Sequence, residues 1–239
     1  MEIKILLANE NILAVEKPCG ILLYSETENQ LSLMSELIKA LPELKNVGEP
    51  PRYGLIHRLD KETSGIVLVA KNNEILKMMQ EKFKKGEIKK EYIALVFGNI
   101  KQKSGVIKCF MARSKADRRK QRCYEIPMKG SVRYRFSETY YEVLKRFKYG
   151  ENVLTMIKAV PKTGRKHQIR CHMAFIGHAI VGDKLYGFKN MRKINKEVRR
   201  SMLHAHKISF EFQDKKIEII SPLPTDFMEF TKNLEDFDD

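Results

Sequence analysis

The stretch HRLDKETSGIVLVAK, residues 57–71, changes abruptly from polar and charged residues to an apolar run. The run IVLVA has the composition of a buried strand, and the Thr-Ser-Gly sequence before it is typical of a turn. Asp60 therefore lies in a turn beside a buried strand, between the cations Arg58 and Lys61. Nearby cations would keep a partly desolvated carboxylate ionised, and such a group can act as a nucleophile or base. Capping of the turn or a structural ion pair is the alternative role.

Helices and short strands are predicted around this stretch. The N-terminal segment predicts two strands joined by an Asn-Glu-Asn turn, and the apolar spacing predicts a helix over 31–41. After the buried strand, Asn72 or Asn73 is expected to cap a further helix. The apolar face expected for that helix consists of Ile75, Met78, Met79 and Phe83.

The second half of the chain is rich in β-branched and aromatic residues, which favours strands. Strands are expected in 91–98, 133–147, 151–160, 203–212 and 215–220, and a helix in 165–177. The elements look like antiparallel hairpins with helices inserted irregularly, so an α+β fold is favoured over a doubly wound sheet. No linker divides the chain, and a single domain over 1–239 is expected.

The chain is strongly basic, with 45 Lys+Arg against 30 Asp+Glu and a net charge of +15. Such a surplus favours a polyanionic partner, usually nucleic acid, whereas an anionic membrane or simple solubility are the alternatives. Two runs, 111–122 and 189–200, each hold six basic residues and one acid. Few acidic residues neutralise these runs, so each run is expected either to contact phosphate groups or to form a solvated surface.

The four cysteines are far apart in the sequence and form no CxxC pair. This pattern favours reduced, buried thiols over a zinc knuckle or a disulfide framework, and a cytoplasmic protein is expected. The N-terminal residues form no signal-peptide core, and no apolar run approaches the roughly 18 residues of a membrane span.

A second dense group of polar residues lies in TGRKHQIRCHMAFIGHAIVGDKLYG, residues 163–187. Basic and amide side chains crowd the expected helix start, where backbone N–H groups favour phosphate or carboxylate. The group consists of Arg165, Lys166, His167, Gln168, Arg170 and His172. A buried Arg170 would need an anionic partner, and Asp60 is the candidate.

Other chemistries find less support in the same residues. His167 and His172 are five positions apart, which does not place two metal ligands on one helix face, and the sequence has no HExxH. It also has no Walker loop, no GxGxxG and no nucleophile elbow. We therefore expect no metal and no nucleotide cofactor. Tyr92 is expected on a strand, either as a core aromatic or as a flat surface on which a base stacks.

Taken together, these blocks resemble the RluA-type family of pseudouridine synthases. HRLDKETSG resembles the family's HRLDxxTSG block, and GRKHQIRCHMAFIGHAIVGDKLYG resembles its GRTHQIRVHxxxxGHPIxGDxxYG block. NILAVEKPCGIL, KEYIALVFG and LHAHKISF are similar to three further segments, so the resemblance spans residues 11 to about 212. Lys166, Cys171, Met173 and Ala179 depart from the family pattern, although none of them is an assigned catalytic position.

The resemblance implies roles for five residues. Asp60 corresponds to the catalytic aspartate, Arg170 to the arginine that pairs with it, and Tyr92 to the tyrosine that stacks on the uracil. Arg58 corresponds to the arginine that displaces the target base, and Leu203 to an apolar residue of the uracil pocket. Further RNA contacts are expected from His57, Arg165, His167 and Gln168, and from Arg113, Arg118 and Arg119 of the first basic run.

The resemblance also implies a fold and a reaction. The expected fold is a mainly antiparallel mixed central sheet flanked by helices and loops, with a central active-site cleft. The reaction cleaves the glycosidic bond of a uridine, turns the uracil and rejoins it through carbon 5, without metal, nucleotide or energy source. The expected partner is structured ribosomal or transfer RNA, and a monomer is the default. No separate N-terminal RNA-binding domain is expected. One alternative is an RNA-binding or ribosome-assembly factor with little turnover. The other is a hydrolytic glycosidase, which is disfavoured because the sequence shows no second well-placed carboxylate.

Overall fold

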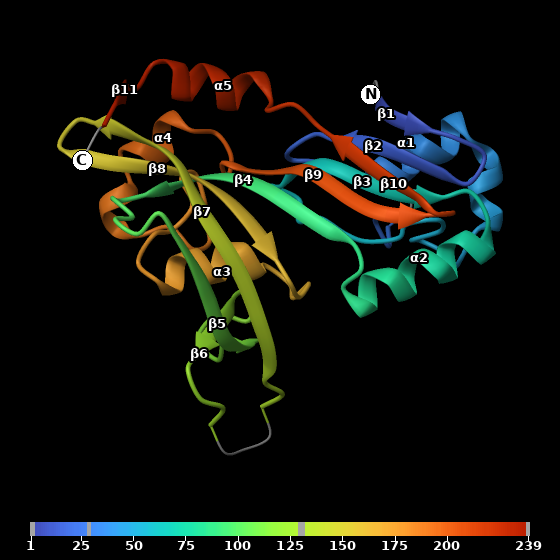
Figure 1. The fold of residues 1–239 in the computed structure, drawn as a ribbon, viewed down its shortest axis with the longest axis horizontal. Coiled ribbons are helices and arrows are strands. Elements are labelled where there is room, and N and C mark those ends of the chain that lie inside the picture. The colour runs from blue at the N-terminus through green and yellow to red at the C-terminus, as the bar shows by residue number, and fades with distance from the viewer. Residues whose placement is uncertain (1–2, 28–29, 129–131, 238–239) are drawn as a thin grey trace. The chain divides into compact units, whose positions relative to one another are not determined.

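The computed structural model describes residues 3–27, 30–128 and 132–237. Two compact units are formed by the chain: residues 1–90 together with 204–222, and residues 91–203 together with 223–239. Figure 1 shows the order of their helices and strands.

The first unit contains an antiparallel sheet with one parallel pair. Strands β1, β2, β3 and β9 follow one another in the sheet, and β10 pairs with β9. The pairing of β3 with β9 is parallel and the other pairings are antiparallel. The elements are β1 (Lys4–Ala8), β2 (Ile12–Lys17), α1 (Leu33–Ala40), η1 (Pro42–Asn46), β3 (Ser64–Ala70), α2 (Asn73–Lys85), β9 (Leu203–Phe212) and β10 (Lys215–Ile220).

Helix α2 begins where the sequence predicts and packs against this sheet. The side chain of Asn72 accepts a hydrogen bond from the backbone N–H of Ile75, which is the expected N-cap. The buried face of α2 includes Leu76 and Met79, whereas Met78 is exposed, so the predicted burial of Met78 is wrong. The packing partners on the strands come from β2, β3, β9 and β10, and they select which side of α2 is buried.

The second unit contains an entirely antiparallel sheet. Strands β4, β8, β7, β5 and β6 follow one another, and β11 pairs with β7. In Figure 1, β5 and β6 are the green hairpin beside the long strand β7. The elements are β4 (Lys89–Phe97), β5 (Ser104–Arg113), β6 (Gln121–Tyr124), β7 (Arg135–Tyr149), β8 (Asn152–Pro161), α3 (Gln168–Phe175), η2 (Lys189–Met191), α4 (Ile194–Glu197), α5 (Thr225–Lys232) and β11 (Glu235–Asp236).

Helix α3 lies on the sheet of the second unit and carries Arg170. Ile169 and Met173 of α3 join the core formed by β4, β7 and β8. The α+β class predicted from the sequence is therefore confirmed, with strands β9 and β10 at the predicted residues. Within the described residues, the helices are all too short or too polar to cross a membrane.

Candidate active site

Asp60 lies in the first unit, on the loop that leads into the buried strand β3. Its carbonyl accepts a hydrogen bond from the backbone N–H of Thr63 at 3.1 Å, which closes the turn. The flanking Leu59 and Thr63 are buried, and Asp60 itself is half-buried. The loop is thus held by buried residues on both sides of the carboxylate.

The start of β3 is fixed by a glycine and a buried hydrogen bond. Gly65 has a φ of +114°, and a Cβ at this position would lie 2.3 Å from the carbonyl oxygen of Ala205. Only glycine therefore fits this close approach of β3 to β9. Beside it, the hydroxyl of Ser64 lies 2.9 Å from Nδ1 of His204. The Thr-Ser-Gly sequence consequently fixes where the loop that carries Asp60 ends.

Lys17 is an anchor of this loop that the sequence analysis missed. Its side chain is fully buried at the end of β2. Its ammonium group donates hydrogen bonds to the carbonyl oxygens of Pro18, Ile21 and Lys61, at 2.8, 2.9 and 2.9 Å. Lys61 directly follows Asp60, so Lys17 ties the turn of the N-terminal block to the loop. A lysine that ends an apolar run just before a proline was the available signal.

His57 and Arg58 occupy different environments within the first unit. His57 accepts a hydrogen bond at Nε2 from the backbone N–H of Leu68 and stacks on Phe83. Burial, reinforced by the charge of Lys90, lowers the pKa of His57 to about 3, so the ring is neutral at pH 7. These contacts give His57 a structural role, whereas its contact with RNA stays a prediction. The exposed Arg58 donates a hydrogen bond to the hydroxyl of Tyr24 at 3.3 Å.

Arg170 lies in the second unit, where the carboxylate of Asp183 accepts two hydrogen bonds from its guanidinium group. Nε donates to Oδ2 at 2.6 Å and Nη2 donates to Oδ1 at 2.9 Å, and both side chains are buried. Burial raises the pKa of Asp183, but the hydrogen bonds from Arg170 outweigh burial, so the pKa lies below its ordinary value. Backbone N–H groups of Leu185 and Tyr186 also donate to this carboxylate.

Asp183 is therefore the anionic partner that a buried Arg170 requires within its own unit. The cost of a buried charge predicts such a partner, but Asp60 was the residue expected in that role. The acidic residue in the same block, thirteen positions after Arg170, could have indicated the second one. The pairing of Arg170 with Asp60 stays a prediction.

The side chains predicted at the start of α3 mainly stabilise the turn before the helix. The helix begins at Gln168, later than expected, and His167 precedes it with a φ of +57°. The amide oxygen of Gln168 accepts hydrogen bonds from the Thr163 hydroxyl and the Arg165 N–H. Its amide nitrogen donates to the carbonyl oxygen of Glu138. Buried Gln168 thus stabilises this turn through its side-chain hydrogen bonds, and its contact with RNA stays a prediction.

The neighbouring Arg165 and His167 also have partners inside the second unit. Nε of Arg165 donates to the carbonyl oxygen of Phe136 at 3.1 Å. Nδ1 of His167 lies 3.1 Å from the hydroxyl of Tyr186, whose ring it meets edge-on. RNA contact by these two residues stays a prediction.

Tyr92 and Leu203 also belong to the second unit. Tyr92 is half-buried on β4, opposite Ala159 of β8, and packs against the core. Leu203 is almost completely buried in the same core. Tyr92 thus packs partly into the core, in agreement with one of the two alternatives. Its stacking on a base, the other alternative, stays a prediction.

The first basic run covers the end of β5, the loop at 114–120 and the start of β6. Arg113 and Arg118 are exposed there, whereas Arg119 is held by a two-pronged ion pair with Asp117. In the second run, Arg200 is buried and paired with Asp226 at 2.6 and 2.9 Å. The second run is therefore only partly a solvated surface.

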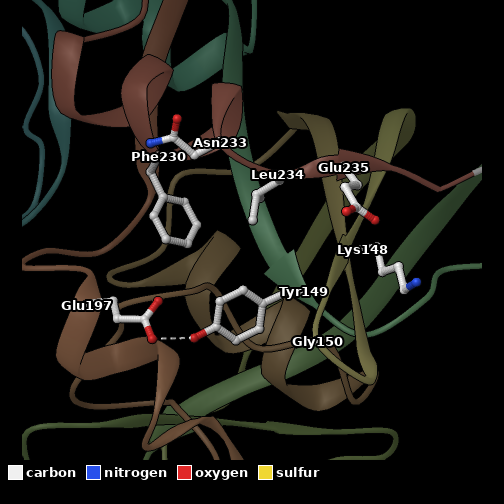
Figure 2. Close-up of a pocket in the computed structure, with 8 residues that line it drawn as sticks. All are labelled: Lys148, Tyr149, Gly150, Glu197, Phe230, Asn233, Leu234 and Glu235. Atoms are coloured by element: carbon white, nitrogen blue, oxygen red, sulfur yellow. Dashed lines mark hydrogen bonds between the residues drawn. The ribbon is translucent and has the colours of Figure 1, made fainter.

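A pocket of about 630 Å³ lies in the second unit, and its lining includes none of the site residues predicted from the sequence. Figure 2 shows Tyr149 in this pocket, with its hydroxyl donating to Glu197 at 2.7 Å. Burial and this carboxylate raise the pKa of Tyr149 to about 12. Phe230 and Leu234 form an apolar wall of the pocket. Nothing in this lining matches the predicted chemistry, so the pocket is not assigned to the reaction.

Known proteins similar to this chain support the expected family. The family model described as RNA pseudouridylate synthase matches residues 11–175. A Helicobacter pylori protein described as an uncharacterized RNA pseudouridine synthase is 32% identical over 99% of this chain and 71% of its own length. The ribosomal large subunit pseudouridine synthase C of Buchnera aphidicola is 32% identical over 97% and 70%. The solved structure of human RNA Pseudouridylate Synthase Domain Containing 1 matches with a TM-score of 0.81 and 25% identity, over 99% of this chain and 89% of the human chain.

Proposed function

Because this chain belongs to the RNA pseudouridylate synthase family, we propose that Asp60 is the catalytic residue with which it isomerises uridines of structured RNA. The activity itself, conversion of uridine to pseudouridine within RNA, follows from membership of this family. The family is the RluA type, as the relatives named large subunit synthases C and D indicate.

The observation that carries this assignment is the anchoring of the Asp60 loop. Lys17 holds the carbonyl group directly after Asp60, and the N–H of Thr63 holds the carbonyl group of Asp60 itself. The backbone at Asp60 and at the residue that follows it is therefore held before substrate binds. A fixed carboxylate suits a reaction in which one oxygen must meet one atom of the sugar, because the orientation needs no further ordering.

Arg170 is proposed to keep Asp60 ionised. Asp183 fixes the plane of the Arg170 guanidinium through Nε and Nη2. A guanidinium group so oriented would favour the charged form of a nearby carboxylate. The ionised form is required whether Asp60 adds to the anomeric carbon or removes a sugar proton to give a glycal.

Arg58 is proposed to displace the target base from the RNA, and Tyr92 is proposed to stack on its uracil. A uridine inside a stem cannot turn, so it must leave the stack at a cost of a few kcal/mol. The exposed Arg58 would fill the space that the base leaves, and the half-buried Tyr92 would stack on the extruded uracil. Exclusion of water would then protect the detached uracil until it rejoins the sugar through carbon 5.

Ribosomal RNA of the large subunit is the proposed substrate. Several relatives at 31–33% identity are named for the large ribosomal subunit, and the +15 charge suits a large polyanion. Loss of modification in transfer RNA alone would contradict this choice of substrate while leaving the reaction intact.

The experiment is carbodiimide mapping of pseudouridines in ribosomal and transfer RNA from a deletion strain. The strain is complemented with the wild type, with Asp60→Asn, or with Tyr92→Phe and Tyr92→Leu. We expect specific sites in large-subunit RNA to disappear on deletion and to return with the wild type but not with Asp60→Asn. Tyr92→Leu should fail to restore them. Restoration by Asp60→Asn would contradict the catalytic role of the aspartate.

A further inference from the structure

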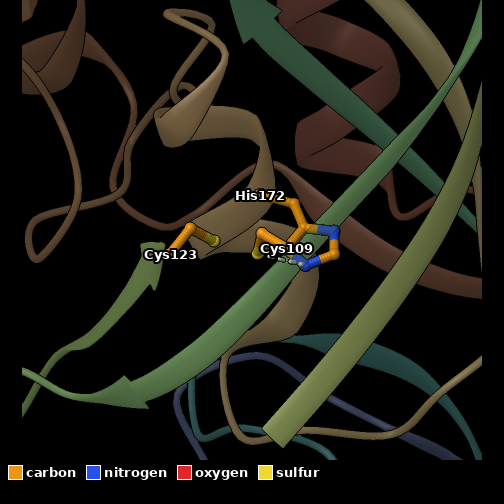
Figure 3. A group of neighbouring side chains, drawn as sticks. All are labelled: Cys109, Cys123 and His172. Carbon is orange, nitrogen blue, oxygen red and sulfur yellow. Dashed lines mark hydrogen bonds between the residues drawn. The ribbon is translucent and has the colours of Figure 1, made fainter. Parts of the chain in front are cut away.

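Three of the four cysteines converge in the second unit although they are far apart in the sequence. Sγ of Cys109, Sγ of Cys123 and a ring nitrogen of His172 all lie within 4.8 Å of one another, and all three residues are buried (Figure 3). Sγ of buried Cys171 lies 3.5 Å from Sγ of Cys123. These three cysteines are free and buried, as the sequence predicts, and folding places them next to one another.

The distances match the edges of a tetrahedral metal site. Zinc bonds of about 2.3 Å to sulfur and about 2.0 Å to nitrogen give edges of about 3.8 Å between two sulfurs and about 3.5 Å between sulfur and nitrogen. Sγ of Cys109 lies 3.4 Å from Nε2 of His172. The separation between Cys123 and Cys171 is 3.5 Å. Three donors of the types that zinc prefers, from Cys109, Cys123 and His172, thus lie close enough together to bind one ion.

Two metal-free arrangements compete with this one. A disulfide between Cys123 and Cys171 would need a sulfur separation of about 2.05 Å, so the 3.5 Å contact is that of two unbonded groups. Alternatively, Nε2 of His172 is held without a metal, 3.4 Å from Sγ of Cys109 and 2.8 Å from the Ser137 hydroxyl. Nδ1 of buried His172 has no hydrogen-bond partner among the residues that the structure describes. A metal at Nε2 would leave Nδ1 in the same state, so the measurement of bound metal decides between the two arrangements.

We propose that Sγ of Cys109, Sγ of Cys123 and Nε2 of His172 bind a zinc ion. The two thiols release their protons to solvent when the ion binds, and the imidazole binds as the neutral ring. All three ligands are buried and none of them has a proposed role in the isomerisation, so the ion would stabilise the fold.

The site would connect the hairpin of β5 and β6 to α3, the helix that carries Arg170. Cys109 lies on β5 and Cys123 on β6, on the two strands that carry the exposed loop at 114–120. Cys171 and His172 directly follow Arg170 on α3. Zinc would thus fix an RNA-binding loop relative to the helix that carries Arg170.

Metal analysis of the purified full chain tests the proposal directly. Protein from zinc-supplemented cells, kept reduced, should contain about one zinc ion per chain by mass spectrometry. Cys19→Ser is the matched control, because it removes a cysteine of the first unit and should retain the metal. Cys123→Ser should lose the metal. Wild-type protein without zinc, or equal zinc in Cys19→Ser and Cys123→Ser, would overturn the proposal.

Cobalt substitution of the wild type needs no variant and so does not depend on whether Cys123→Ser folds. Chelated protein titrated with Co²⁺ should show tetrahedral visible bands and a thiolate-to-cobalt band that saturate at about one equivalent. Cys109→Ser should weaken the thiolate band by about half, because one of the two thiolates is lost. The spectrum of octahedral aqueous cobalt would contradict the site.

Limited proteolysis tests the proposed connection. Chelation should accelerate tryptic cleavage within 113–122 of the wild type, and restored Zn²⁺ should reverse the acceleration. A cleavage rate that does not respond to zinc would contradict the role of the site in fixing the hairpin.

Discussion

The buried ammonium group of Lys17 donates a hydrogen bond of 2.9 Å to the carbonyl oxygen of Lys61, the residue after Asp60. The two residues are 44 positions apart, and the bond connects the end of β2 to the proposed catalytic loop. Hydrogen bonds to charged groups are about twice as strong as neutral ones. This contact therefore links the geometry of the proposed site to the core of the first unit.

Lys17→Met should lower the free energy of unfolding by roughly 3 kcal/mol, measured with urea. Three carbonyl oxygens lose their donor, although loss of the buried charge offsets part of that cost. Lys61→Met is the matched control, because it keeps the backbone carbonyl and changes only an exposed side chain. Equal unfolding free energies for the two variants would show that the ammonium contacts contribute little.

Asp183→Asn should destabilise the protein by about 3 to 5 kcal/mol, because it strands the buried charge of Arg170. Asp226→Asn provides the comparison. Its carboxylate pairs in the same two-pronged way with Arg200 but is 56% exposed, so water can replace it and the loss should be smaller. Similar losses for both variants, measured by urea unfolding, would contradict the importance of burial.

The same pair predicts how stability depends on acid. The folded-state pKa of Asp183 lies below its unfolded value, so the stability from the pair is fully present above about pH 4. It is lost as the pH falls through the folded-state pKa. Between pH 5 and pH 2, the wild type should therefore lose more unfolding free energy than Asp183→Asn. Parallel pH profiles would contradict the depressed pKa.

His57 should make the protein less stable in mild acid. Its pKa of about 3 in the folded state is below the unfolded value near 6.5. Between these values the unfolded chain binds the extra proton, so stability falls as the pH is lowered. From pH 6.5 to pH 5, the wild type should lose roughly 2 kcal/mol more than His57→Gln, measured by urea unfolding. Equal losses of unfolding free energy in the wild type and in His57→Gln would contradict the lowered pKa of His57 in the folded state.

Charge reversal in the basic hairpin should weaken RNA binding specifically. Arg113→Glu with Arg118→Glu should lower affinity at moderate salt and reduce the slope of log K against log salt by about 1.5. Lys215→Glu with Lys216→Glu makes the same change in net charge on exposed residues of β10. Equal weakening by both pairs, in a filter-binding titration, would indicate that only the total charge matters.

Much of the fold could be predicted because local patterns and burial agree. Strands β9 and β10 match the predicted residues, since their apolar and β-branched residues mark them clearly. The start of α2 follows from Asn72, whose cap is a local interaction. In contrast, α3 begins at Gln168 because that side chain bonds to Thr163 and Glu138, and periodicity carries no information about such contacts.

Single polar residues at the ends of strands and in loops were the least predictable part of the site. Lys17 and Asp183 act through partners that only folding brings together, so their positions in the sequence are weak signals. The need of Arg170 for an anion was predictable from the cost of a buried charge, but the sequence alone does not choose between Asp60 and Asp183. The convergence of Cys109 and Cys123 likewise depends on the pairing of β5 with β6.

The most direct test of the account is the catalytic role of Asp60. Rejoining uracil through carbon 5 displaces the hydrogen there, so RNA tritiated at that position releases its label on turnover. We expect Asp60→Asn to release tritium at least about 1000-fold more slowly than the wild type while binding the RNA equally well. Asp214→Asn, which changes an exposed aspartate of the same unit, should react normally. Release by Asp60→Asn within about threefold of the wild type would contradict the assignment of Asp60 as the catalytic residue.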